Sequence, residues 1–123
     1  MTIKYHESGI WVERLNDSTY RLGLSEKGQD DVGEVMFAEL SVPVAPIKKG
    51  DALLNVEGAK AVTEITIPFD ATVTAVNEAL EDEPSMLNQS DKALNWIVEV
   101  TDVDSSLVDT LDDTAFKENE DNQ

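Results

Sequence analysis

The chain has 123 residues, of which 41% are hydrophobic, and this fits one domain with a single core. The absence of cysteine excludes disulfide bonds, a thiolate nucleophile and a thiolate metal site. The net charge of −17, from 26 acidic and 9 basic residues, makes nucleic acids and anionic membranes poor partners, because phosphate binding needs clustered Lys and Arg.

The sequence also lacks the marks of export and of membrane insertion. Its first six residues do not combine the basic start and the apolar stretch of a secretory signal. No apolar run approaches the roughly 20 residues that a membrane-spanning helix needs. We therefore expect a cytoplasmic monomer with no membrane or nucleic-acid partner.

The N-terminal half is typical of short strands separated by turn residues. We expect strands at 10–15, 19–24 and 34–40, with a turn at 16–18. Ser25 is placed to cap a short helix and Gly33 to end it. Residues 42–47 contain two prolines, so they are expected to form an edge strand or a loop.

The C-terminal half continues the same pattern, with expected strands at 52–56, 61–67, 72–76 and 95–101. A short helix is expected within 77–83, before Pro84, and a C-terminal helix is expected to begin at the cap Asp104. The sequence thus predicts a mostly β sandwich or barrel. We expect one domain over residues 1–116 and an acidic disordered tail over 117–123.

One lysine lies in a setting suited to covalent modification. Lys60 follows Glu57, Gly58 and Ala59, precedes Ala61, and has a strand-like run on each side. Gly58 permits the backbone angles of a turn, and the two alanines leave the lysine sterically accessible. The β-branched residues of 62–67 favour a stiff hairpin. The layout predicts a lysine amine held out at a hairpin tip.

Each of these residues also has an ordinary interpretation. Without its sequence context, Lys60 is interpreted as an ordinary surface lysine and Glu57 as a solvated carboxylate. A biotin carrier also displays a hairpin lysine, but that family has Met on both sides of it, whereas Lys60 has alanines.

Further motifs along the chain support the interpretation of Lys60 as a modified lysine. They begin with Ile10-Trp11-Val12-Glu13, Leu22-Gly23-Leu24-Ser25 and a helix ending at Gly33, and continue with a strand ending in Glu39-Leu40. Glu57, Lys60 and Ala61 match Glu-x-x-Lys-Ala, and Pro68, Asn77-Glu78-Ala79-Leu80, Pro84, Asn88 and Trp96 follow in order. On this ordered set, over about residues 8–100, the chain resembles the H protein of the glycine cleavage system.

The resemblance implies a lipoyl-domain-like β-sandwich, a barrel-sandwich hybrid with short helices and a C-terminal helix. It implies lipoate in amide linkage to Lys60, with Glu57, Gly58, Ala59 and Ala61 as the recognition hairpin. It further implies a carrier that is not itself an enzyme. The implied partners are glycine decarboxylase, aminomethyltransferase, dihydrolipoamide dehydrogenase, and a lipoate ligase or transferase. The dithiolane would supply the redox and group-transfer chemistry, and the protein would supply presentation and docking.

The chain departs from the family pattern at several places. Gly58 and Ala59 replace the usual Ser-Val, Ala71 stands where a Gly is usual after Pro68, and Asn95 replaces the Gly before Trp96. A divergent H-like branch also carries Asn-Trp at this place. The alternative function is therefore that of an H-like lipoylated protein, serving lipoate relay or redox-linked ADP-ribosylation instead of glycine breakdown.

Other function classes find little support in the residues. His6 is the only histidine, is expected near a mobile terminus, and is interpreted as a surface residue. Without Cys or a histidine-centred triad, nucleophilic catalysis lacks its usual groups. Residues 102–106 resemble a calcium loop but lack its third ligand and its Gly, so we interpret them as a helix cap. Trp11, Trp96 and Phe69 are expected to pack in or against the core.

Overall fold

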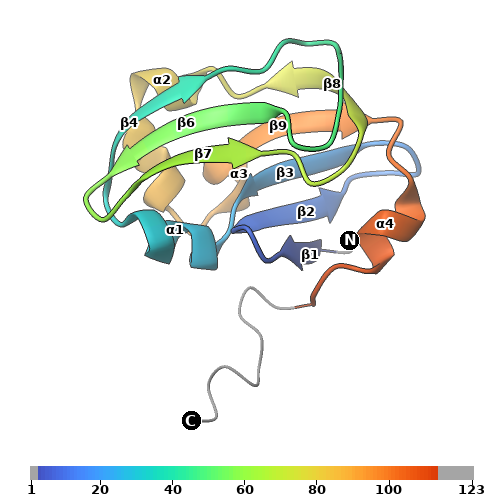
Figure 1. Ribbon diagram of the computed structural model, residues 1–123, viewed down its shortest axis with the longest axis horizontal. Coiled ribbons are helices and arrows are strands. Elements are labelled where there is room, and N and C mark those ends of the chain that lie inside the picture. The colour runs from blue at the N-terminus through green and yellow to red at the C-terminus, as the bar shows by residue number, and fades with distance from the viewer. Residues whose placement is uncertain (1–2, 114–123) are drawn as a thin grey trace, which may run out of the picture.

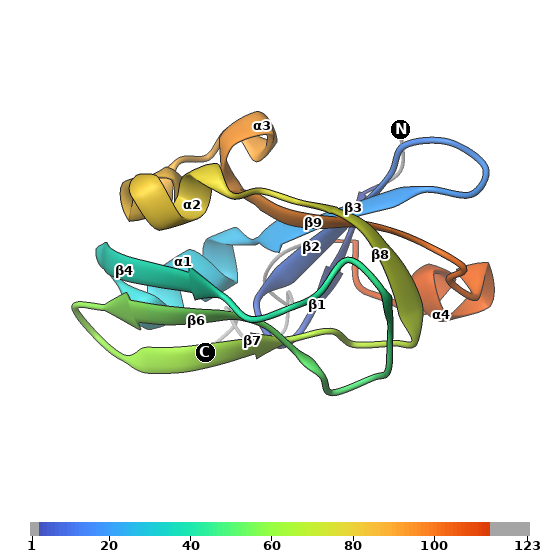
Figure 2. The same ribbon diagram turned by 90° about the horizontal axis from the view of Figure 1, so that it is seen from above.

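The protein is described here by a computed structural model, which describes residues 3–113. Two antiparallel sheets face each other (Figures 1 and 2). The larger has six strands in the order β1-β2-β3-β9-β8-β5, and the smaller has three in the order β4-β6-β7. The predicted mostly β sandwich is confirmed.

The elements follow the predicted turns and caps closely. The strands are β1 (Ile3–His6), β2 (Ile10–Arg14), β3 (Tyr20–Leu24), β4 (Val35–Leu40), β5 (Pro46–Ile47), β6 (Ala52–Gly58), β7 (Val62–Thr66), β8 (Ala71–Val76) and β9 (Trp96–Thr101). The helices are α1 (Glu26–Val32), α2 (Ala79–Asp82), the 3₁₀ helix η1 (Pro84–Asn88), α3 (Lys92–Asn95) and α4 (Ser105–Asp109).

The predicted helix caps are confirmed. The Ser25 side chain accepts a hydrogen bond from the Gly28 N–H at the start of α1, and Gly33 ends that helix with a φ of 76°. Asp104 caps α4 by accepting from the Ser106 N–H at 3.0 Å. The hydrogen bonds that Ser106 donates also lower the pKa of the Asp104 carboxyl.

The core lies between the two sheets and draws on both. Leu22, Val98 and Val100 of the larger sheet and Leu54 and Val56 of the smaller one are all buried in one continuous cluster. The alternation along each strand sets this pattern, because successive side chains point to opposite faces.

The larger sheet also buries a side chain on the face that points away from the core, namely that of Trp11. The Trp11 ring packs against Gly23 of the neighbouring strand, and its Nε1 donates to Asn95 Oδ1 at 2.8 Å. Trp11 and Phe69 are buried and Trp96 is half-buried, so the packing predicted for all three is confirmed.

Three elements were not predicted, namely β1, η1 and α3. His6 belongs to β1, where it pairs with Ile10, so it lies in the larger sheet and is half-buried. None of the described helices has the length and apolar character to cross a membrane. The predicted acidic tail over 117–123 lies outside the described residues.

Candidate functional site

Lys60 lies at the tip of the hairpin that joins β6 to β7. The strands pair as far as Glu57 and Val62, and the Gly58 N–H closes the turn by donating to the Ala61 carbonyl at 2.9 Å. Ala59 and Lys60 are exposed, and Gly58 and Ala61 are half-buried. The structure therefore brings together all five residues singled out from the sequence.

The tip is pinned to the corner between α1 and β4. The Lys60 N–H donates to the Val32 carbonyl, and the Ala59 N–H donates to the Glu34 carbonyl, both at 2.9 Å. The last carbonyls of a helix have no partner within the helix, so the Lys60 N–H caps the end of α1. The backbone position of the lysine is thus fixed by hydrogen bonds to a second element. Figure 1 shows the tip of the β6–β7 hairpin beside α1.

Two glycines permit this close approach. A Cβ on Gly58 would lie 2.1 Å from the Val32 carbonyl oxygen, and a Cβ on Gly33 would lie 2.9 Å from Lys60 Cγ. Gly33 also has a positive φ, which L side chains rarely adopt. Gly33 therefore both ends α1 and leaves room for the lysine stem. Its role as a helix stop was predicted, but its contact with Lys60 was not.

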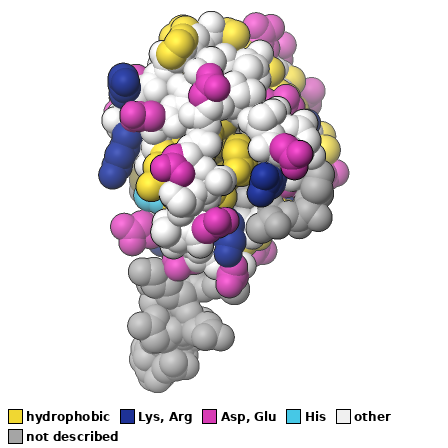
Figure 3. All heavy atoms as spheres, turned by 90° about the vertical axis from the view of Figure 1, so that its right-hand side faces the viewer, with side chains coloured by type: hydrophobic (Ala, Val, Ile, Leu, Met, Phe, Trp, Pro, Cys, Tyr) yellow, Lys and Arg dark blue, Asp and Glu magenta, His cyan; other side chains and the backbone are white. Residues whose placement is uncertain are grey.

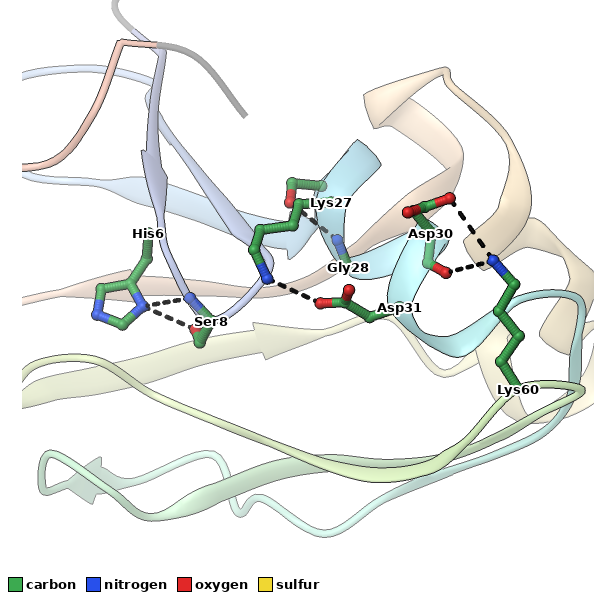
Figure 4. A network of polar contacts seen from close by, with 8 residues as sticks. His6, Ser8, Lys27, Gly28, Asp30, Asp31 and Lys60 are labelled. Carbon is green, nitrogen blue, oxygen red and sulfur yellow. Dashed lines mark hydrogen bonds and ion pairs between the residues drawn. The ribbon is translucent and has the colours of Figure 1, made fainter. Parts of the chain in front are cut away.

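The Lys60 amine contacts Asp30 in the C-terminal turn of α1 (Figure 4). Nζ donates to the Asp30 carbonyl oxygen at 3.0 Å and lies 3.7 Å from Asp30 Oδ1. The lysine side chain is 61% exposed, and an ion pair this open contributes little to stability. The amine is therefore reachable, and little is lost when it leaves this contact.

Asn88 of η1 ties the same corner to the rest of the fold. Its Oδ1 accepts from the Val35 N–H at 2.7 Å, and its Nδ2 donates to the Gly33 carbonyl at 2.9 Å. The sequence pattern included Asn88 but gave it no role, because its partners lie more than 50 residues away.

The outer face of the small sheet carries a row of side chains at the level of the tip. Phe37 of β4 is opposite Glu57 of β6, which is opposite Val62 of β7. Residues directly opposite on neighbouring strands have side chains on the same face. All three are exposed. Sequence reasoning named Glu57 alone in this row.

His6 lies away from Lys60, on the other side of α1 (Figure 4). Its Nδ1 accepts a hydrogen bond from the Ser8 N–H at 3.1 Å, and burial is the main cause that lowers the pKa of its imidazole. Lys49 lowers this pKa further, against the opposing effects of Glu7 and Asp112. Within residues 3–113, no group of three or more His, Asp and Glu side chains is arranged to hold a metal ion.

Comparisons with known proteins point in one direction. The sequence model of a protein family described as glycine cleavage H-protein matches residues 3–121. A glycine cleavage system H protein from Vibrio vulnificus is 38% identical over 112 residues, which cover 91% of this chain and 89% of the relative. A probable glycine cleavage system H protein from Thermococcus kodakarensis is 37% identical over 116 residues, covering 93% of this chain and 86% of that protein.

A solved structure shares the fold. The crystal structure of a glycine cleavage system H protein from Mycobacterium marinum has a TM-score of 0.69 to this chain at 20% identity, covering 80% of this chain and 82% of that chain. The family match spans nearly the whole sequence, and the sequence relatives agree with it. The chain belongs to the glycine cleavage H-protein family.

Proposed function

We propose that the chain is a lipoyl carrier of the glycine cleavage system, with lipoate in amide linkage to Lys60. It has no catalytic residues of its own and takes the aminomethyl group of glycine from the decarboxylase to the aminomethyltransferase. Dihydrolipoamide dehydrogenase reoxidises the arm, and a lipoate ligase or transferase attaches it. One observation carries the proposal, namely an exposed lysine on a pinned hairpin in a chain of this family. The same proposal makes the chain a cytoplasmic monomer with one domain over residues 1–116.

The residues around Lys60 fit an acylated lysine. The Nζ is reachable, the residues before and after Lys60 are both alanine, and Gly33 leaves space for the lysine stem. Bound lipoate supplies a dithiolane that accepts electrons and carries a one-carbon unit. The protein fixes the position of the Lys60 backbone and supplies the docking surface.

Acylation changes the electrostatics of Lys60 itself. An amide nitrogen has no positive charge, so the ion pair with Asp30 is lost when the arm is attached. Because that pair is exposed, its loss has little effect on folding stability. Attachment therefore removes the charge interaction with Asp30, leaves Nζ one N–H for the Asp30 carbonyl, and keeps the backbone hydrogen bonds of the hairpin.

The test of attachment is the intact mass of the protein purified from lipoate-fed cells, beside the variant Lys60→Arg. We expect one lipoyl amide on the wild type and none on the variant, because a guanidinium is not acylated by such enzymes. A lipoyl group on Lys60→Arg, or no group on the wild type in cells with an active ligase, would contradict the assignment of this site.

The pathway is tested separately with the loaded carrier. We expect it to support the exchange of labelled bicarbonate into glycine by a cognate glycine decarboxylase, and apo carrier to serve as the blank. A loaded carrier that stays inactive with this decarboxylase would favour the H-like function in lipoate relay or ADP-ribosylation.

A further inference from the structure

Exposed apolar side chains are concentrated beside the Lys60 hairpin. Six large apolar side chains remain exposed among residues 3–113, and three of them, Met36, Phe37 and Val62, lie on β4 and β7 next to the tip. Phe37 is 49% exposed and Val62 is 78% exposed. We call Met36, Phe37, Glu57 and Val62 the tip face.

A β-bulge produces part of this exposure. Val35 is opposite Gly58 and Phe37 is opposite Glu57, so Met36 is an extra residue with no partner on β6. Val35 and Ala38 are buried, whereas Met36 and Phe37 between them are both exposed. Without the bulge, strict alternation would turn one of these two residues toward the core. The bulge therefore presents two large apolar side chains where a regular strand presents one.

The tip face is short and is bordered by carboxylates. Phe37, Glu57 and Val62 form one row, and because strands are about 4.8 Å apart this row is roughly 10 Å wide. The next row on the same face consists of Glu39, Asn55 and Glu64, with both carboxylates exposed. A partner with a complementary surface has a small apolar patch surrounded by Lys or Arg.

We infer that the tip face is the docking surface for the enzyme that acylates Lys60. The inference rests on the proposed function and names the residues that select the loading enzyme. That enzyme brings an activated lipoyl carboxyl carbon to Nζ, which displaces the leaving group and loses a proton. It must therefore close around the lysine before any arm exists, and the residues beside the tip become its contact surface.

The enzymes that use the loaded carrier have a different geometric requirement. They react with the far end of the arm, so their reaction does not require contact with the residues next to Lys60. Substitutions in the tip face are therefore expected to slow loading and to spare the later steps.

The experiment uses the full-length apo protein and a purified lipoate ligase with lipoate and ATP. Initial loading rates are measured by intact mass over a range of carrier concentrations for the wild type, Phe37→Thr and Val62→Thr. Threonine keeps the β-propensity of each strand and removes apolar surface. Val44→Thr is the matched control, because Val44 is also a largely exposed valine, at 62%, but lies in the loop between β4 and β5.

We expect Phe37→Thr and Val62→Thr each to raise the KM for the carrier roughly tenfold with little change in kcat, the size typical of an interface anchor. Val44→Thr should stay within about twofold of the wild type. Thermal unfolding of all four proteins checks that the variants are folded. Preloaded variants should support glycine–bicarbonate exchange within about twofold of the wild type.

Several results would overturn the inference, and they differ from failure of the proposed function. Unchanged KM in both tip-face variants would remove the surface from the loading step. Normal loading with impaired exchange would assign the surface to the decarboxylase. Sedimentation that shows a wild-type dimer, lost in Phe37→Thr, would assign it to a second copy of the chain. If the ligase loads neither the wild type nor any variant, the lipoyl-carrier proposal itself fails. This inference then fails with it.

Discussion

The position of Lys60 depends on a residue two places before it that has no side chain. Gly58 lets the hairpin lie directly against the Val32 carbonyl at the end of α1, and the Lys60 N–H then caps that carbonyl. The family usually has Ser at this place, and a serine Cβ here would meet the same oxygen at 2.1 Å. In this chain the glycine is therefore a requirement of the local packing and not an interchangeable small residue.

Gly58→Ala is expected to slow lipoylation of Lys60 about tenfold. The added Cβ must push the hairpin away from Val32, and this breaks the hydrogen bond that holds the Lys60 backbone. The measurement is the initial loading rate by intact mass.

The control for this variant is Gly50→Ala. Gly50 has a positive φ but nothing within 4 Å of an added Cβ, so alanine there should cost about 1 kcal/mol of stability and leave loading unchanged. Wild-type loading of Gly58→Ala would show that the pinned backbone is not needed by the enzyme.

At this scale the sequence predicted that Lys60 lies at a hairpin tip, but not what holds it there. A glycine, two alanines and flanking strands predict a tip. The partners of the tip are backbone carbonyls of Val32 and Glu34, which lie more than 20 residues earlier. Any residue has a carbonyl, so no residue type at these positions reveals the contact.

Among the elements, periodicity predicted the long strands and missed the short pieces. The apolar residues of β3 alternate, β2 is followed by the turn at 16–18, and β9 is rich in β-branched residues, so each has a sequence signal. The helix α3 has four residues, about one turn, so no period can be seen in it. The bulge in β4 was also missed, because an extra residue in one strand is visible only against its partner.

Asn88→Ala is expected to destabilise the fold by about 1–3 kcal/mol, because the half-buried Val35 N–H and Gly33 carbonyl lose their partner. The measurement is the free energy of unfolding from a urea titration. The expected loss reflects the position of η1 as a brace between α1 and β4.

Ser85→Ala in the same 3₁₀ helix is the control, because Ser85 is exposed, and its stability should stay within about 0.5 kcal/mol of the wild type. Equal stabilities of Asn88→Ala and Ser85→Ala would show that η1 does not brace the corner.

Over the whole molecule, charge repulsion works against the fold. Carboxylates are scattered over the face shown in Figure 3, with few Lys and Arg among them. Apart from the more shielded Arg21–Glu99 pair, each ion pair of the described residues has at least one well-exposed side chain and so contributes little. A net charge of −17 on one small domain therefore leaves a net repulsion in the folded state.

We expect the melting temperature to rise by several degrees between 20 mM and 500 mM NaCl near pH 7. Salt shortens the range of the repulsion to a few ångströms, and the unfolded chain gains less because its charges are further apart. The measurement is thermal unfolding followed by circular dichroism. Sucrose at matched osmolality separates screening from preferential exclusion, and a melting temperature that falls with salt would mean that the ion pairs outweigh the repulsion.

The order of strands in the larger sheet sets a time at which the carrier becomes complete. The strand β9 comes late in the chain but lies between β3 and β8 in the sheet. The edges of β3 and β8 that pair with β9 therefore stay unpaired until residue 101 has been made. At about 5–20 residues per second, this takes on the order of 5–20 s of translation. The β4-β6-β7 sheet with its lysine is already synthesised by then, but Leu54 and Val56 still lack the Val98 and Val100 that complete their shared core. We therefore expect a chain truncated before β9 to carry the Lys60 hairpin on an open core and to be cleaved by proteases faster than the complete chain.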